Sequence, residues 1–105
     1  MWFTQGVVMS HIRVGVYAVT NGTAKEAADK AQEGMLSVFR GQPGFQAYGL
    51  AEAQDGKVIS VSLWDSADQA QKANEVAASW VRENVADRIR LESTQVGDFF
   101  FYETA

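Results

Sequence analysis

The sequence predicts a single α+β domain whose elements follow in the order strand, helix, strand, strand, helix, strand. Three observations predict this class: segments in which apolar and polar residues alternate, two segments with apolar residues at helical spacing, and turn signals between them. The length of 105 residues suits one domain with one core, which we expect over residues 10–105. Residues 1–9 are expected to be an N-terminal extension or a short apolar arm.

The first strand is expected over residues 10–19, where apolar residues alternate with polar or small ones. Asn21 and Gly22 then signal a turn. Thr23 and Glu26 have capping-box spacing, in which the hydroxyl and the carboxylate satisfy free amides at a helix start. An apolar stripe predicts one continuous helix over residues 24–39, ended by Gly41 and the proline that follows.

Two paired strands are expected next. Pro43 and Gly44 suit the central positions of a type II turn, after which a strand is predicted from residue 45 to about 53. Asp55 and Gly56 signal a hairpin that joins it to a buried strand over residues 58–64. This strand ends at Trp64, and its alternation places the ring on the same face as two small hydroxyls, those of Ser60 and Ser62.

The last two elements are a second helix and a fourth strand. Ser66 and Gln69 have the spacing of a second capping box, and the apolar stripe behind them predicts a helix that ends near residues 88–90. The fourth strand is expected over residues 93–104. Its four consecutive aromatic residues, 99–102, would point to both faces of the sheet.

The order βαββαβ predicts a ferredoxin-like arrangement, an antiparallel four-stranded sheet with two helices on one face. The opposite face would then carry two aliphatic rows, an exposed patch larger than a soluble monomer normally has. These rows are Ile12, Val14, Val16 and Ala18 in the first strand and Ile59, Val61 and Leu63 in the third. A homodimer that packs sheet on sheet would cover them.

Composition narrows the classes of function. There is no cysteine and only one histidine, so thiolate chemistry is excluded and a metal site is not expected. The net charge of −4 and the scattered basic residues argue against nucleic-acid binding. No segment has the roughly 20 apolar residues of a membrane span, and the N-terminus lacks the features of a secretion signal. We therefore expect a cytoplasmic protein.

Two short motifs at fixed places in this element order resemble a known superfamily. They are the segment 42–45, Gln-Pro-Gly-Phe, before the second strand and the segment 63–66, Leu-Trp-Asp-Ser, between the third strand and the second helix. With this spacing, residues 10–104 resemble the dimeric α+β barrel superfamily and, within it, the antibiotic biosynthesis monooxygenase-like domain. The resemblance implies a homodimer with one apolar pocket per subunit.

The resemblance also implies a chemistry. Relatives that form quinones use no metal or flavin: the pocket deprotonates a phenolic substrate, and the resulting carbanion reduces oxygen directly. In that group an Asn precedes the tryptophan by four residues and a Tyr follows it by six, positions held here by Ser60 and Ala70. The haem-degrading branch has an Asn near the position of Gly15 and a His on the second helix, which has none here. Haem degradation is therefore not expected, and no cofactor is predicted.

Antiparallel topology brings candidate site residues to the Trp64 end of the sheet. His11 is the candidate general base, while Arg13 and Ser60 are candidates to stabilise a developing anion. Trp64, Phe39, Met35 and the small Ala70 are the candidate substrate-binding residues. The alternative is that Trp64 fills this space as a core ring.

Three further aromatic residues are expected elsewhere. Tyr17 and Tyr48 fall toward the other end of the sheet, where core packing with satisfied hydroxyls is the favoured interpretation. Trp80 lies roughly 21 Å back along its helix from Ser66, at about 1.5 Å per residue, so it is expected in the core and away from Trp64.

Two main hypotheses about function follow. The first is a cofactor-independent monooxygenase-like protein that acts on a small aromatic compound. The alternative is a homodimer of the same fold that holds a small ligand, or none, without chemistry. A regulatory ligand-binding module with the same strand order is a third interpretation.

Overall fold

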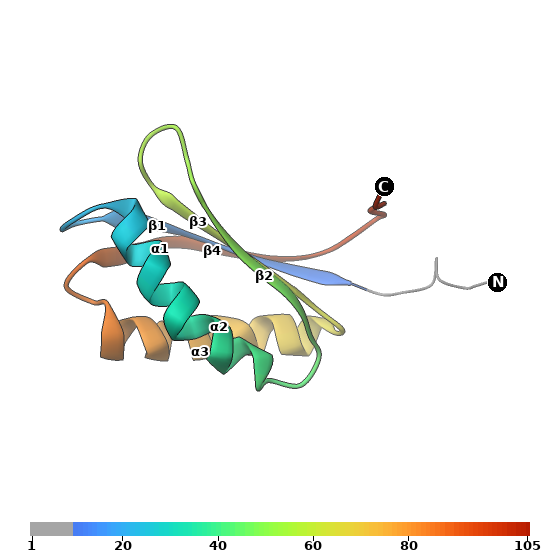
Figure 1. Ribbon diagram of the computed structural model, residues 1–105. Helices are drawn as coiled ribbons and strands as arrows, with labels where there is room; N and C mark the ends of the chain where they lie inside the picture. The colour runs from blue at the N-terminus through green and yellow to red at the C-terminus, as the bar shows by residue number, and fades with distance from the viewer. Residues whose placement is uncertain (1–9) are drawn as a thin grey trace.

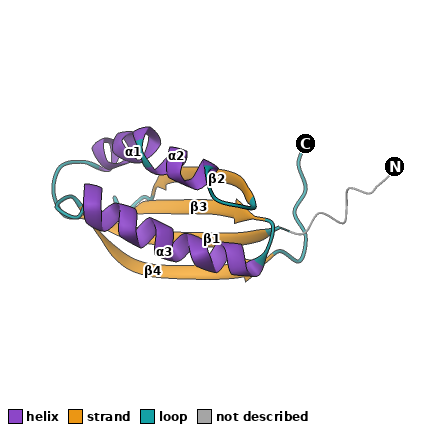
Figure 2. Cartoon of the chain, turned by 90° about the horizontal axis from the view of Figure 1, so that it is seen from below, coloured by secondary structure: helices purple, strands orange, loops and turns teal. Residues whose placement is uncertain are grey.

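A computed structural model describes residues 10–105, which fold into four antiparallel strands and three helices (Figure 1). The predicted extension or arm at 1–9 lies outside the described residues. The strands follow the order β2-β3-β1-β4, and all helices lie on one side of the sheet (Figure 2). This arrangement confirms the predicted ferredoxin-like α+β fold. The elements are β1 His11–Val19, α1 Ala24–Glu33, α2 Met35–Arg40, β2 Phe45–Glu52, β3 Val58–Trp64, α3 Ala67–Asn84 and β4 Ile89–Asp98.

The register of β1 on β3 decides which side chains share the helix-covered face. His11 lies opposite Trp64, and Arg13 lies opposite Ser62. Opposed residues in an antiparallel pair point to the same face, and that face repeats every second residue. His11, Arg13 and Tyr17 therefore share a face with Ser60 and Trp64, as the sequence-based hypothesis requires.

The opposite face of the sheet is not covered by any helix of the described chain. The aliphatic residues predicted for it are all partly exposed, while their neighbours on the helix-covered face are mostly buried. In the β1–β3 pair the two rows meet at the centre of the sheet, where Val14 lies opposite Val61. The sheet thus has one apolar face that remains open.

The prediction of one continuous helix over residues 24–39 is wrong. The helix is divided at Gly34 into α1 and α2. A Cβ at this position would lie 2.7 Å from Cζ2 of Trp80, so the Trp80 ring occupies the space that a side chain here would need. Periodicity alone cannot reveal this contact, because the apolar stripe continues across the break.

The start of each long helix was predicted from a capping box, and only one box is complete. Thr23 and Glu26 form both reciprocal bonds at the start of α1. At the start of α3 the Ser66 hydroxyl accepts from the Gln69 amide, but the second half is missing. The Gln69 amide group packs instead against Gly44, whose φ of +78° and absent Cβ leave room for it.

The end of α3 falls earlier than predicted. The helix ends at Asn84, not near residues 88–90. The carbonyl of Arg88 accepts from the amides of Thr20 and Asn21, and Ile89 already pairs with Val19. Pairing with β1 therefore draws residues 88 and 89 out of the helix.

The last strand is shifted relative to its prediction over residues 93–104. It spans Ile89–Asp98, and its last residue lies opposite His11, the first residue of β1. One further bond joins the Phe99 amide to the Ser10 carbonyl at 3.4 Å. The chain leaves the sheet after this strand (Figure 1), and the side chains of Phe100 and Phe101 are largely exposed. The expectation that these rings point to both faces of the sheet is therefore wrong.

Candidate functional site

A small cavity lies between the helix layer and the sheet. Its volume is about 30 Å³, against the 10–15 Å³ that a single water requires. Apolar side chains of all three helices line it, among them Met35, Phe39 and Trp80. Its polar wall comes from the sheet and consists of Arg13, Tyr17, Tyr48 and Ser60.

Arg13 is the central polar residue of this wall and is only 1% exposed. Its Nε donates to Oδ1 of Asn74 at 2.7 Å, Nη1 to Oγ of Ser60 at 3.2 Å, and Nη2 to the hydroxyl of Tyr17 at 3.0 Å. All three acceptors are neutral. A buried guanidinium is normally paired with a carboxylate, because removing its charge from water is costly. Arg13 has no such partner among residues 10–105.

Gly15 leaves room for the Arg13 guanidinium over the sheet. A Cβ there would lie 2.9 Å from Nη2 of Arg13 and 3.2 Å from Cε1 of Tyr17. Since Gly15 stands between these two residues on the same face, its missing side chain lets Arg13 extend along β1 to reach the Tyr17 hydroxyl. Any larger residue at position 15 would displace this contact.

Tyr48 brings a second phenol to the cavity from β2. Burial raises the pKa of the Tyr48 phenol to about 12, with Tyr17 acting in the same direction and Arg13 against it. The hydroxyl is therefore protonated at neutral pH and able to donate a hydrogen bond. It makes none with the described residues.

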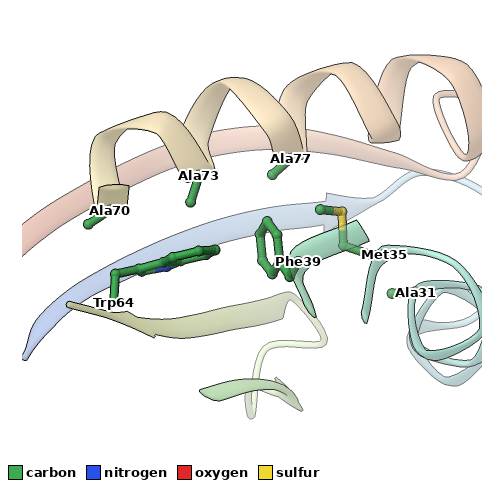
Figure 3. Packing of buried hydrophobic residues seen from close by; sticks show 7 residues of the cluster. All are labelled: Ala31, Met35, Phe39, Trp64, Ala70, Ala73 and Ala77. Atoms are coloured by element: carbon green, nitrogen blue, oxygen red, sulfur yellow. The ribbon is translucent and has the colours of Figure 1, made fainter. Parts of the chain in front are cut away.

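Trp64 is a buried ring, 1% exposed, and is not part of the cavity wall. It packs edge-on to Phe39 and Phe45, with ring centroids 5.2 and 5.6 Å apart, and its indole nitrogen donates to Ser62. The small side chains of Ala70 and Ala73 lie above its ring (Figure 3). The ring thus fills the space beneath these alanines. Trp64 also lines an open surface hollow beside Gln42 and Pro43.

His11 lies at the outer end of the sheet. Its Nδ1 pairs with the carboxylate of Asp98, and its side chain is 13% exposed. It does not line the cavity, although it lies two residues along β1 from Arg13. Two groups of candidate residues result: Arg13, Ser60, Met35 and Phe39 meet at the cavity, whereas His11, Trp64 and Ala70 do not line it.

Three residues that line the polar wall or bond to Arg13 are not among the predicted site residues: Tyr17, Tyr48 and Asn74. The sequence pattern favours core packing with a satisfied hydroxyl for Tyr17 and Tyr48. Arg13 satisfies the Tyr17 hydroxyl, whereas the Tyr48 hydroxyl has no partner among the described residues. A sequence signal for Tyr17 exists, because Arg13, Gly15 and Tyr17 share one face of β1. No local pattern marks Asn74 or Tyr48, which come from other elements.

The described residues contain no group of three His, Cys, Asp or Glu side chains that could hold a metal ion. Within the same part of the chain, no helix combines the length and apolarity needed to span a membrane.

Similar solved structures share the whole fold at low sequence identity. A protein of unknown function from Nitrosomonas europaea is 12% identical, with a TM-score of 0.74 over 95% of this chain and 98% of that one. The monooxygenase ActVA-Orf6 of Streptomyces coelicolor, solved with nanaomycin D, is 22% identical, with a TM-score of 0.61 over 92% and 90%. SnoaB, a cofactor-independent oxygenase from Streptomyces nogalater, is 16% identical, with a TM-score of 0.58 over 91% and 96%.

No curated protein matches the chain by sequence. A family does: residues 10–79, more than half of the chain, match the family described as antibiotic biosynthesis monooxygenase. The match covers β1 to most of α3 and so includes Arg13, Tyr48 and Ser60. The chain therefore belongs to the antibiotic biosynthesis monooxygenase family and is a monooxygenase-like protein.

Proposed function

We propose that this protein is a monooxygenase that uses no cofactor and acts on a small aromatic compound held between the helices and the sheet. The observation that carries the proposal is the buried guanidinium of Arg13 at the cavity wall, bonded to the Ser60 hydroxyl at 3.2 Å. A positive charge fixed in an apolar site stabilises a negative charge that forms on a substrate far more than the same charge in water. Family membership supports oxygenation as the reaction.

The proposed reaction converts an activated methylene group to a carbonyl. A base removes one proton from the substrate R₂CH₂, and the anion that forms is stabilised by Arg13 and Ser60. This anion supplies the electrons that reduce O₂. One oxygen atom stays in the product R₂C=O, and the other leaves as water, so that R₂CH₂ and O₂ give R₂C=O and H₂O.

His11 is the proposed base. Asp98 holds its Nδ1, which leaves Nε2 to accept a proton. The Arg13 guanidinium lies over Gly15, which at roughly 3.3 Å per residue is roughly 13 Å along β1 from His11, so a substrate that reaches both must be longer than one aromatic ring. A substrate with its oxygen at Arg13 and its reactive carbon toward the end of the sheet would lie between the two.

The apolar candidates have supporting roles in this proposal. Met35 and Phe39 form the wall against the substrate ring. Trp64 holds Phe39 in place through its edge-on contact, and Ala70 leaves room for Trp64 below α3. A ring needs more room than about 30 Å³, so substrate binding requires the helices to move outward from the sheet.

The cavity volume favours a second candidate function, a small-ligand-binding protein without chemistry. About 30 Å³ accommodates a group of a few atoms without any movement of the helices. Under this alternative Arg13 binds the ligand, and His11 has only a structural role at the end of the sheet.

The proposed working form is a homodimer in which the open sheet faces pack together. The partner is a second copy of the chain because a two-fold axis can place the same aliphatic rows against each other. Burial of these rows removes an apolar patch centred on Val14 and Val61 from water.

Oxygen consumption with a panel of anthrones, which carry an activated methylene group, tests the proposed reaction. We compare the parent with Arg13→Met, which removes the charge, and His11→Asn, which removes the base. Each is expected to lower turnover about 100-fold or more. Arg40→Met, at an exposed position on α2, is the matched control and should leave turnover unchanged.

Circular dichroism and thermal melts of each variant establish that it is folded. The proposal is refuted if the folded parent consumes no oxygen with any member of the panel. Turnover that survives unchanged in both folded variants would refute the roles of Arg13 and His11.

A further inference from the structure

The polar wall of the cavity is rich in hydrogen-bond donors. A guanidinium has five N–H groups and no acceptor, and three of those of Arg13 have partners. Ser60 and Tyr17 use their oxygens to accept from Arg13, so their own hydroxyl protons are left to donate. Tyr48 lines the same cavity with a protonated hydroxyl. A group that accepts several hydrogen bonds therefore suits this wall.

The charge of the cavity is also unbalanced. The other Arg, Lys and His side chains that form ion pairs in the described residues lie toward solvent, and Arg13 takes part in none of these pairs. The ion pairs involve His11, Lys25, Lys57, Lys72, Arg88 and Arg90. Burial of the guanidinium costs free energy, and neutral groups in the cavity do not compensate its charge.

We propose that the cavity binds the carboxylate group of an anionic ligand, held by Arg13, Tyr17 and Tyr48. The inference rests on the site of the proposed function and names its substrate class. An anion that forms only during a reaction would leave Arg13 uncompensated for most of the time. A ligand that arrives as a carboxylate compensates the charge in the resting complex.

Shape and size favour a carboxylate over other anions. The planar guanidinium matches the planar carboxylate, which accepts two parallel hydrogen bonds. The cavity of about 30 Å³ suits a group of three heavy atoms better than a tetrahedral phosphate. The apolar wall of Met35, Phe39 and Trp80 suits the hydrocarbon part of the same ligand.

Calorimetric titration of the full chain tests this inference at constant ionic strength. The probes are acetate and benzoate, their neutral isosteres acetamide and benzamide, and inorganic phosphate. We expect at least one carboxylate to bind about ten-fold or more tightly than its amide and than phosphate. Arg13→Gln should weaken carboxylate binding about ten-fold or more, whereas the exposed Arg40→Gln should not change it.

Tyr48→Phe removes one donor and keeps the packing, so it should weaken carboxylate binding by a smaller factor. This variant also serves if Arg13→Gln fails to fold. Equal binding of carboxylate and amide, tighter binding of phosphate, or full binding by both variants would overturn the inference, as would the absence of binding by any carboxylate.

The binding test separates this inference from the proposed function. If carboxylates bind through Arg13 and no oxygen is consumed, the anion site stands and the oxygenase fails. If oxygen is consumed on neutral substrates and carboxylates do not bind, the oxygenase stands and the anion site is wrong.

Discussion

Arg13 and Trp64 illustrate how surroundings determine what a residue does. Both lie on the helix-covered face of the sheet, and both are 1% exposed. Trp64 is enclosed by aromatic rings and alanines, so it acts as a packing anchor (Figure 3). Arg13 is enclosed by neutral oxygens at a cavity wall, so its charge is available to a ligand. The polar residue is therefore the stronger functional candidate.

The buried phenol of Tyr48 should make the stability of the protein depend on pH in the alkaline range. Because burial raises the pKa of Tyr48 from 10.0 to about 12, the unfolded chain loses this proton first as the pH rises. The free energy of unfolding is therefore unaffected by this group below about pH 10. It falls by about 2 kcal/mol as the pH rises from there toward 12. Urea unfolding across this range should show a steeper loss in the parent than in Tyr48→Phe. An identical pH dependence in both proteins would contradict the buried, protonated state.

At the scale of elements, the break at Gly34 sets the geometry of the cavity. It separates α1 from α2 and lets the Trp80 ring of α3 pack against the chain at the junction. Met35 and Phe39 follow directly on α2 and reach the cavity from there. A continuous helix would point these two side chains in other directions relative to α1.

Gly34→Ala tests the break. The added methyl meets Trp80 at 2.7 Å, and overpacking costs about 1–3 kcal/mol, more than the gain of up to about 1 kcal/mol in helix propensity. We expect a lower free energy of unfolding in urea. In a Trp80→Leu background the clash is removed, and the same substitution should be neutral or stabilising. An equal cost in both backgrounds would show that Trp80 is not the cause.

At the scale of the whole molecule, the sheet has one covered face and one open face. The helices cover one face of the sheet and leave the other open (Figure 2). Arg13 and Trp64 are buried on the covered face, while the rows around Val14 and Val61 on the open face are partly exposed. A second copy that packs on this open face would cover its apolar side chains. The cavity lies on the other side of the sheet, so each copy would keep its own site.

Val14→Lys tests the proposed dimer. A charge at the centre of the open face would have to be buried in the interface without a partner, at a cost of several kcal/mol. Sedimentation velocity at micromolar concentration should give a dimer for the parent and a monomer for Val14→Lys. Val38→Lys, at an exposed position on α2, is the control and should remain dimeric. A monomeric parent would refute the dimer.

Local patterns predicted most of the fold because each depends on neighbours in the chain. The alternation in β1 and β3, the Thr23 cap and the three glycine turns specify strands, a helix start and loops where they stand. The errors came where a distant partner decides. The break at Gly34 depends on Trp80, and the end of β4 depends on where β1 begins.

The same division applies to the site. The element order, the two faces of the sheet and the row that carries His11, Arg13 and Tyr17 follow from the sequence pattern alone. The burial of Trp64 in the core, and the contacts of Arg13 with Ser60, Tyr17 and Asn74 in place of a carboxylate, depend on how the helices pack on the sheet. The physical reason is that periodicity specifies the face to which a side chain points. Burial and charge balance depend on which other elements pack against that face.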